Sequence, residues 1–506
     1  MRIFRDGGSR LACCLLGSLA LMCSAAAAAA PAASAQATRT VTVNLVRSAP
    51  GSPVPGRFLG LSFEAAALPQ LAPDAGQGDL VALLRSLGSG VLRFGGITSD
   101  ENVAWTDPQT PRPAWASSVI DAADLQQIGD IARHSSWKVL LTVGMAHFEP
   151  AAAAREVAAA HRALGNLLEA VEIGNEPDSY GRHGFRELPW IAQGYEEQVD
   201  IYREAIAALT PGVPIAGPDV SGSGLFPEWG AAEALAQAPV LLTGHHYPLG
   251  CAQVPPPSIE ELLSPDTRIR EERSLSVYLA VSRHAGIPVR IDETNSVSCG
   301  GVAGISDTFA SALWAAGYIT ESMAAGTAGI NLQGNPTNCA GYTPLCATDA
   351  ATLATGELSA EPDWYALLLT RSLIGARPIP TELEAEGSPD LLVEAFEGRS
   401  HSLKLMLLDD EPPGASPMSV RVDVGRDMGS AIVLRMTAAS QSAVGGVLLG
   451  GHSVAPDGSW QPPRVPDRVA VHAGVLNVGL PASSAELVTV NVAKLRPRPR
   501  RVRRNR

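Results

Sequence analysis

Two segments of the chain place carboxylates where strand-like runs end. The first, Val171–Pro177, reads VEIGNEP and places Glu176 at the end of the run, directly before a proline. The second, Arg290–Asn295, reads RIDETN and contains Glu293. Two facing carboxyl groups are what glycoside hydrolysis requires, because one protonates the leaving oxygen while the other is an ionised nucleophile. In a retaining reaction the two groups lie about 5–5.5 Å apart.

Side-chain alternation along a strand separates the candidates within each segment. Glu172 and Glu176 have the same parity, but only Glu176 lies at the end of its run, so we expect Glu172 to pair with another group deeper in the fold. Asp292 and Glu293 are expected to point to opposite sides of their strand. We assign Glu293 as the reactive carboxylate and Asp292 as a structural capping or pairing residue.

Short β-rich runs alternate with longer helical segments from about residue 58, and these elements must position the carboxylates. The fold class that this pattern predicts is α/β, a (β/α)8 TIM barrel, in which reactive side chains lie at the carboxyl ends of the strands. A doubly wound sheet is less compatible, because the first run ends in Leu61–Glu64 rather than in a glycine-rich phosphate loop. The eight predicted strands are Phe58–Glu64, Val91–Gly96, Lys138–Met145, Ala170–Glu176, Pro214–Val220, Leu241–Tyr247, Ile287–Thr294 and Gly326–Gly334.

After Arg377 the pattern changes to short β-rich runs separated by Gly, Pro, Asp and Ser, which is typical of an antiparallel β-sandwich. Thr40–Val46 is also strand-like and is expected to join this sandwich. The predicted boundaries are 36–56 for this N-terminal strand, 57–376 for the barrel and 377–493 for the sandwich. The predicted sandwich strands are Leu391–Glu397, Ser402–Leu408, Ser419–Val424, Ala431–Met436, Val447–Leu449, Arg468–Ala470 and Glu486–Val490.

The two ends of the chain differ from its body. Three arginines precede the apolar run Leu11–Ala30, which is followed by the small-residue pattern Ala33–Ala35, so residues 1–35 are predicted to be a signal peptide. An uncleaved membrane anchor is the alternative, because the run is long for a signal core. No later segment is apolar enough to span a membrane. Residues 494–506 alternate Arg with Pro and are predicted to be a disordered basic tail.

The charge of the chain limits its partners. The net charge is −13, and removing the +8 of the tail and the +2 of the first ten residues leaves −23 on residues 11–493. Such an acidic body argues against nucleic-acid binding. It also argues against a long sulfated substrate, which would favour a cleft rimmed by Lys and Arg. The basic tail is the one feature suited to an acidic surface. Oligomeric state is not readable from the sequence.

Four cysteines follow the predicted signal peptide, and an even number in an exported protein predicts disulfides. Cys339 with Cys346 would close a short loop, and Cys251 with Cys299 would then join two loops. Zinc binding is the alternative, but no Cys-x-x-Cys motif or Cys/His cluster supports it. We predict no metal ion and no organic cofactor.

Several motifs resemble those of known glycosidases. Gly174-Asn175-Glu176-Pro177 is similar to the acid/base motif of the clan A retaining glycosidases, whose catalytic pair lies on strands four and seven. Further segments narrow the resemblance to glycoside hydrolase family 79, the β-glucuronidase and heparanase family, over residues 57–375. These segments are Leu92–Gly96, Glu293–Ser296, Cys299–Gly301, Ser306–Ala310 and Gly341–Pro344.

The resemblance implies roles for individual residues. Glu176 would be the acid/base, Glu293 the nucleophile, and Asn175 would hydrogen-bond the sugar 2-hydroxyl. The glucuronate carboxylate would be bound by tyrosine hydroxyls and backbone amides rather than by arginine. The residues that match this carboxylate site are Tyr342, Gly300 and Tyr247, and those that would line the rest of the sugar subsite are Glu64 and Ser99 or Asp100.

A disulfide between Cys251 and Cys299 would pin the carboxylate-binding loop, which is a departure from family members that lack cysteines there. His245 and His246 could support Glu293.

These expectations lead to one main hypothesis and its alternatives. The chain is expected to be a secreted or periplasmic retaining exo-β-glucuronidase that forms a covalent glycosyl-enzyme intermediate. Its partner would be a β-glucuronide or a glucuronate-containing glycan. The alternatives are a heparanase-like endo-β-glucuronidase, a clan A β-glycosidase for neutral sugars, and a sugar-binding barrel without catalysis. The intact pair of Glu176 and Glu293 disfavours the last of these.

Overall fold

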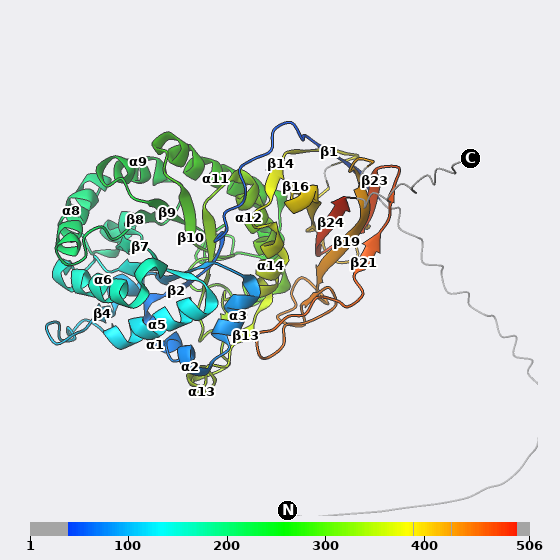
Figure 1. The fold of residues 1–506 in the computed structure, drawn as a ribbon. Coiled ribbons are helices and arrows are strands. Elements are labelled where there is room, and N and C mark those ends of the chain that lie inside the picture. The colour runs from blue at the N-terminus through cyan, green and yellow to red at the C-terminus, as the bar shows by residue number, and fades with distance from the viewer. Residues whose placement is uncertain (1–38, 388, 427, 493–506) are drawn as a thin grey trace, which may run out of the picture. The chain divides into compact units, whose positions relative to one another are not determined.

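The computed structural model describes residues 39–492 except 388 and 427. The predicted signal peptide, residues 1–35, and the predicted tail, residues 494–506, lie outside the described residues. Within them, eight parallel strands form a barrel (Figure 1) in the order β7-β6-β3-β2-β11-β10-β9-β8. A bridge between Val171 and Ile215 joins the last strand to the first, so the sheet closes on itself. The strands are β2 Leu59–Glu64, β3 Val91–Gly95, β6 Lys138–Val143, β7 Leu168–Ile173, β8 Ala216–Val220, β9 Leu241–His246, β10 Val289–Thr294 and β11 Gly329–Gly334.

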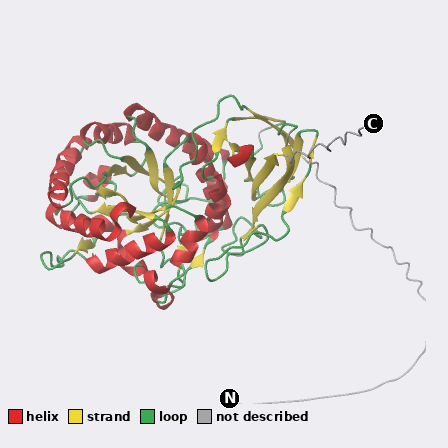
Figure 2. Cartoon of the chain, in the orientation of Figure 1, coloured by secondary structure: helices red, strands yellow, loops and turns green. Residues whose placement is uncertain are grey.

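Helices follow the strands and form a ring outside the barrel (Figure 2). α5 illustrates how the sequence specifies them: Asp121 and Asp124 form a capping box at its start, and its apolar stripe of Leu125, Ile128 and Ile131 is fully buried. None of the helices among the described residues is both long and apolar enough to cross a membrane. The main helices are α3 Leu80–Leu87, α5 Ala122–Ser135, α6 Pro150–Leu164, α8 Ala192–Leu209, α9 Phe226–Ala236, α11 Pro265–Ala285, α12 Phe309–Ala325 and α14 Pro362–Thr370.

A β-sandwich follows the barrel in the chain. One sheet has the order β15-β1-β18-β23-β22, and the other has the order β14-β16-β17-β24-β19-β20, with β21 paired to β19. Alternating side chains of both sheets, such as Val41, Leu405 and Val478, form a buried core of their own. The strands are β1 Arg39–Leu45, β14 Arg377–Ile379, β15 Thr381–Ala385, β16 Leu391–Glu397, β17 Leu403–Asp409, β18 Met418–Asp423, β19 Met428–Thr437, β20 Leu448–Leu449, β21 Asp467–Val469, β22 Val471–His472, β23 Val475–Leu480 and β24 Ser484–Val492.

The predicted fold class is confirmed, and each of the eight predicted barrel strands is present. β1, which precedes the barrel in the chain, lies between β15 and β18 of the sandwich, and it pairs with β18 in parallel rather than antiparallel. β1 and β18 are far apart in the chain, so no hairpin between them requires an antiparallel pairing. β14, β15, β22 and β23 were not predicted from the sequence. The burial of β23 alternates as in a half-buried strand.

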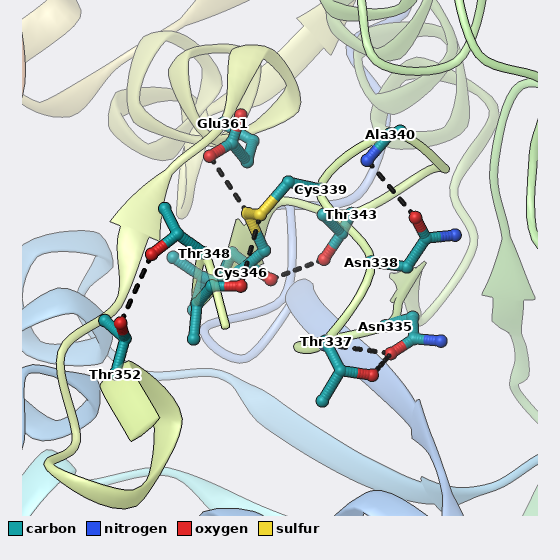
Figure 3. The surroundings of a disulfide bond; sticks show 12 residues. Asn335, Thr337, Asn338, Cys339, Ala340, Thr343, Cys346, Thr348, Thr352 and Glu361 are labelled. Atoms are coloured by element: carbon teal, nitrogen blue, oxygen red, sulfur yellow. Dashed lines mark hydrogen bonds between the residues drawn. A yellow bond between two sulfur atoms is a disulfide. The ribbon is translucent and has the colours of Figure 1, made fainter. Parts of the chain in front are cut away.

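Two disulfides connect the four cysteines after residue 35: Cys251 with Cys299, and Cys339 with Cys346. Both lie in loops that follow barrel strands, and the second is shown with its surroundings in Figure 3. Disulfides stabilise a fold mainly by restricting the unfolded chain.

A pair of buried carboxyl groups links two barrel helices. Glu196 on α8 and Glu233 on α9 are both buried, and each carboxyl group affects the pKa of the other. Burial raises the pKa of Glu196 to about 7. Burial and the neighbouring charge of Glu196 raise the pKa of Glu233 well above its usual range. The folded protein therefore keeps a proton on this pair at pH values where the unfolded chain has released it.

This pair predicts that the free energy of unfolding falls as the pH rises from about 5 to 8, because unfolding releases protons in that window. Glu233→Gln keeps a hydrogen-bond donor for Glu196 and removes one titrating group. Its free energy of unfolding should depend less on pH, and at pH 8 it should exceed that of the wild type by about 1–2 kcal/mol, since one pKa unit corresponds to about 1.4 kcal/mol. Urea denaturation at several pH values measures this. Glu204→Gln, at an exposed position of α8, is the control, and an unchanged pH slope in Glu233→Gln would contradict the assignment.

Candidate active site

Glu176 lies just beyond the end of β7. The strand was expected to continue to Glu176, but it ends at Ile173, because Gly174 and Glu176 both have left-handed backbones, with φ of 81° and 46°. The turn is held by backbone hydrogen bonds from the amide of Gly174 to Val143 and from the amide of Glu176 to Asp219. Pro177 then starts a short 3-10 helix, Pro177–Ser179. The turn directs Glu176 into the mouth of the barrel.

Glu293 lies on β10 at an irregular position. The register of β10 against β9 shifts between Ile291 and Glu293, which is the mark of a β-bulge. The expectation that Asp292 and Glu293 point to opposite sides is wrong as a result, since both reach the same buried guanidinium. Oδ2 of Asp292 lies 3.1 Å from Nε of Arg93, and Oε2 of Glu293 lies 2.8 Å from Nη1.

Arg93 on β3 is fully buried at the centre of this cluster. Its guanidinium donates hydrogen bonds to Glu172, Asp219 and Glu293 at 2.8–3.0 Å. A further hydrogen bond of 2.9 Å reaches Oδ1 of Asn175. Burial opposes the charged form, but the surrounding carboxylates hold the pKa of Arg93 well above its ordinary value. Arg93 is therefore a permanent cation that orients both the predicted nucleophile and the predicted sugar-binding amide.

His245, at the end of β9, connects the acid/base candidate to this cluster. Its Nδ1 lies 2.9 Å from Oε1 of Glu176, and its Nε2 lies 2.8 Å from Oδ1 of Asp219. Burial disfavours the imidazolium, but the charges of Glu293 and Asp219 and the two hydrogen bonds raise the pKa of His245 well above its ordinary value. Of the two catalytic candidates, Nδ1 of His245 lies closer to Glu176, at 2.9 Å, than to Glu293, at 3.8 Å.

The two aspartates of the cluster differ in protonation: Asp292 is neutral and Asp219 is ionised. Burial and the charges of Glu172 and Asp219 raise the pKa of Asp292 well above its usual range, so this group is neutral. Burial also opposes ionisation of Asp219, but Arg93 and His245 outweigh it and lower the pKa of Asp219 below its usual range. Asp219 is therefore the counter-ion of both cations.

The carboxyl groups of Glu176 and Glu293 lie close enough for retaining chemistry. One carboxylate oxygen of each, with a ring nitrogen of His245, lie within 4.8 Å of one another. Such a trio could also bind a small cation. However, Arg93 and His245 already supply the positive charge that these carboxylates require.

A cleft of about 670 Å³ opens above this pair. Of the residues predicted for the site it is lined by Glu64, Asn175, Glu176, Tyr247, Glu293, Gly300 and Tyr342, and also by Ile97, His183, Ser221, Gln333 and Asn335. The lining includes neither Lys nor Arg. An anionic ligand of this cleft would find no Lys or Arg in its lining, where the hydrogen-bond donors include tyrosine hydroxyls, side-chain amides and His183.

Two tyrosines line the cleft beside the predicted nucleophile. The hydroxyl of Tyr247 donates to Oε1 of Glu293 at 2.8 Å and lies 3.2 Å from the hydroxyl of Tyr342. The two rings are stacked with centroids 5.8 Å apart. Burial and the charge of Glu293 raise the pKa of both tyrosines, so both hydroxyls stay protonated as donors.

Glu64, at the end of β2, is a carboxyl group with a raised pKa. It accepts hydrogen bonds from the amide and hydroxyl of Thr98, at 3.0 and 2.7 Å, and lies 3.4 Å from Nε2 of Gln333. Burial and the charge of Glu293 raise the pKa of Glu64 to about 7. Near neutral pH it can therefore either donate or accept a hydrogen bond in the cleft.

Ser99 does not lie with the other predicted residues. It is buried, it donates to the carbonyl of Gly96 at 2.8 Å, and it is not part of the cleft lining. Its neighbour Asp100 is also buried, but it accepts hydrogen bonds from the amide of Asn175 and the hydroxyl of Tyr180, at 2.9 and 2.6 Å. Asp100 thus holds the turn that carries Asn175 rather than a ligand.

The sequence analysis assigned no role to Arg93, Asp219 or Gln333. A signal existed for the first, because a lone arginine in the apolar run VLRFG must find carboxylates when it is buried. Asp219 lies at the end of its strand, as the chosen carboxylates do. No local pattern distinguishes Gln333, which joins the cleft only because β11 ends beside β2.

No protein-family model and no curated protein matches the chain. Its fold is shared with solved glycoside hydrolases. The 4-O-α-L-rhamnosyl-β-D-glucuronidase from Fusarium oxysporum, solved with Rha-GlcA, has a TM-score of 0.69 at 19% identity and covers 89% of this chain and 100% of its own. The GH51 arabinofuranosidase from Xanthomonas axonopodis pv. citri has a TM-score of 0.64 at 14% identity and covers 90% and 100%. The GH39 enzyme from the same organism has a TM-score of 0.57 at 16% identity and covers 90% and 98%.

These structural neighbours are clan A glycoside hydrolases, and the likeness establishes a common fold. The barrel alone could not supply such coverage, so the likeness extends into the C-terminal β-sandwich.

The opposite charge states of the two aspartates can be tested with matched amide variants. Asp292→Asn keeps a neutral group of the same shape and should change the free energy of unfolding by less than about 1 kcal/mol. Asp219→Asn removes the carboxylate that the two buried cations share and should lower the free energy of unfolding by about 3–5 kcal/mol. Urea denaturation at pH 7 measures both. Equal losses in the two variants would show that the charge states are assigned wrongly.

Proposed function

We propose that this protein is an exported retaining β-glucuronidase of glycoside hydrolase family 79 that removes terminal glucuronic acid from its substrate. The observation that carries the proposal is the pair of Glu176 and Glu293, whose oxygens lie within 4.8 Å at the mouth of a barrel, beside tyrosine donors in a cleft without Lys or Arg. The separation suits a covalent glycosyl-enzyme intermediate rather than direct attack by water, which needs about 6.5–9.5 Å.

In the first step Glu293 attacks the anomeric carbon while Glu176 protonates the departing glycosidic oxygen. The contact of His245 with Oε1 leaves Oε2 of Glu176 for the transferred proton. In the second step a water molecule attacks the glycosyl ester, and Glu176 takes a proton from that water. Glu293 is released as a carboxylate, and the anomeric configuration is retained.

Arg93 and Tyr247 keep the nucleophile in place during these steps. They bind different oxygens of Glu293, Oε2 and Oε1 respectively, and so fix the orientation of its carboxyl group. Asn175, fixed by Arg93 and Asp100, is placed to bind the 2-hydroxyl of the sugar, a contact that strengthens in the transition state.

The uronate specificity rests on neutral donors. Protonated tyrosine hydroxyls and a backbone amide at Gly300 can bind a carboxylate without an arginine. The Fusarium neighbour is a β-D-glucuronidase by its description, which supports a glucuronide substrate for a chain of the same fold. The lack of basic lining residues favours short, unsulfated glucuronides and therefore an exo mode. Two disulfides and the predicted signal peptide support an extracytoplasmic location.

A panel of aryl glycosides tests the proposal. The kcat/KM for 4-nitrophenyl β-D-glucuronide should exceed that for the β-D-glucoside, the β-D-xyloside and the α-L-arabinofuranoside by about tenfold or more, as one charge-assisted hydrogen bond provides. Glu293→Gln should abolish turnover, whereas Glu187→Gln, at an exposed position of a rim loop, should not. Equal rates on glucuronide and glucoside would refute the uronate specificity. Absence of turnover on every glycoside would favour a sugar-binding barrel.

Polysaccharide fragments in the same panel separate exo from endo action. Heparan sulfate and hyaluronan fragments should release glucuronic acid only from their non-reducing ends. Internal cleavage products would instead indicate a heparanase-like enzyme.

The role of Tyr342 in carboxylate binding predicts a specific loss. Tyr342→Phe removes one hydroxyl donor, so kcat/KM for the glucuronide should fall by about tenfold or more while that for the glucoside changes little. Tyr365→Phe is the matched control, because its hydroxyl accepts from the amide of Val454, away from the cleft. An unchanged ratio of glucuronide to glucoside activity in Tyr342→Phe would refute the assignment.

A further inference from the structure

Three loops supply the proposed carboxylate donors. Tyr247 follows β9, Gly300 lies in the loop after β10, and Tyr342 lies in the loop after β11. We call these three residues the uronate wall. They are contiguous, because the hydroxyls of Tyr247 and Tyr342 lie 3.2 Å apart and the backbone amide of Tyr342 donates to the carbonyl of Gly300 at 3.2 Å. Each member lies within four residues of a disulfide cysteine.

The loop of Gly300 contains one residue, Cys299, whose backbone conformation is unfavourable for a non-glycine residue. Cys299, Gly300 and Gly301 have consecutive positive φ values of 60°, 88° and 87°. A non-glycine residue in this region costs of order 1 kcal/mol or more, and it persists only where surrounding structure enforces it. The disulfide of Cys299 with Cys251 is such an enforcing contact, and it joins this loop to the one that follows Tyr247.

Backbone contacts continue the same connection. The amide of Ser298 donates to the carbonyl of Leu249 at 3.0 Å, and the amide of Cys251 donates to Oγ of Ser298 at 3.1 Å. The loops after β9 and β10 are therefore held together along several residues, and the disulfide closes a chain separation of 48 residues. Without it, ordering these loops around a bound sugar would require more conformational entropy to be lost.

The second disulfide closes the loop that carries Tyr342. Cys339 and Cys346 flank this residue, and Sγ of Cys346 lies 3.1 Å from Oε1 of Glu361 at the start of α14 (Figure 3). Asn335 and Asn338 add local turns by accepting from the amides of Thr337 and Ala340, at 2.9 and 3.3 Å (Figure 3).

The closed loop is also seated against the loop of Gly300. The amide of Tyr342 donates to the carbonyl of Gly300 at 3.2 Å. A Cβ on Gly341 would lie only 2.2 Å from that carbonyl, so the two loops meet where only glycine fits.

We propose that the two disulfides are positioning elements of the uronate wall: they fix its three donors at the separation that a glucuronate carboxylate requires and so determine specificity rather than catalytic rate. This inference rests on the proposed function. The catalytic pair is fixed mainly by strands, Arg93 and His245. Tyr247, which directly follows β9, is the member of the wall that also contacts the pair, through Oε1 of Glu293.

Paired serine variants test the proposal. Cys251→Ser with Cys299→Ser, and separately Cys339→Ser with Cys346→Ser, should raise KM for 4-nitrophenyl β-D-glucuronide by about tenfold while kcat changes by less than about twofold. The kcat/KM for the β-D-glucoside should stay as in the wild type. The Cys251/Cys299 pair should raise KM more than the other pair, because its disulfide also fixes the backbone of Cys299–Gly301. Circular dichroism and thermal unfolding at the assay temperature confirm that each variant is folded.

Combination with Tyr342→Phe shows whether the effect passes through the wall. If it does, adding Cys339→Ser with Cys346→Ser to Tyr342→Phe should raise KM much less than this pair does in the wild type, since the donor that this disulfide positions is already absent. Equal losses on glucuronide and glucoside, full additivity with Tyr342→Phe, or unchanged KM would each overturn the positioning role. A wild-type enzyme without glucuronide preference would refute the proposed function itself. A preserved preference in both serine pairs would refute only this inference.

Discussion

A guanidinium can be buried in the centre of a barrel only when carboxylates and polar groups surround it, and Arg93 meets this condition through residues of three other strands. Glu172 comes from β7, Asp219 from β8, and Asp292 and Glu293 from β10. Removing a charge from water costs several kcal/mol per ion. If one member of such a cluster moves, another buried charge is therefore left without its partner. The position of the proposed nucleophile is thus fixed by the same interaction that joins the strands of the barrel.

This constraint also divides the carboxyl groups by charge. Two cations, Arg93 and His245, cannot neutralise every acid around them, so one acid must keep its proton. Asp292 is that group, because burial and two neighbouring carboxylates act on it together, whereas Asp219 lies between the two cations. Glu293 keeps a direct bond to Arg93 and a second bond to Tyr247. The cluster in this way assigns different chemistry to adjacent residues of one strand.

The sequence was sufficient for the fold class and for the acid at each strand end, because both depend on local periodicity and on where a strand stops. Glu176 and Glu293 belong to patterns that can be read along the chain. The inward turn of Asp292 could not be read in this way, because it depends on a bulge that forms only when β9 and β10 pair. The cluster of carboxyl groups around Arg93 could not be predicted for a similar reason. Its members are residues 172, 219, 292 and 293, and no local sequence pattern connects them. Ser99 fails as a cleft residue because its hydroxyl bonds to Gly96, three residues earlier.

A glucuronate bound as proposed would bring a negatively charged sugar close to a carboxylate nucleophile, which Coulomb repulsion would disfavour in a dry site. The two anions would have different main partners, which reduces this repulsion. The charge of Arg93 neutralises Glu293, whereas tyrosine hydroxyls and a backbone amide would bind the sugar carboxylate. Tyr247 belongs to both sets, since its hydroxyl bonds Glu293 and adjoins Tyr342. When Glu293 becomes an uncharged ester, its hydrogen bond from the Tyr247 hydroxyl weakens. That hydroxyl can then donate to the sugar carboxylate instead. Binding of the uronate would then tighten as the covalent bond forms, which couples substrate recognition to the first chemical step.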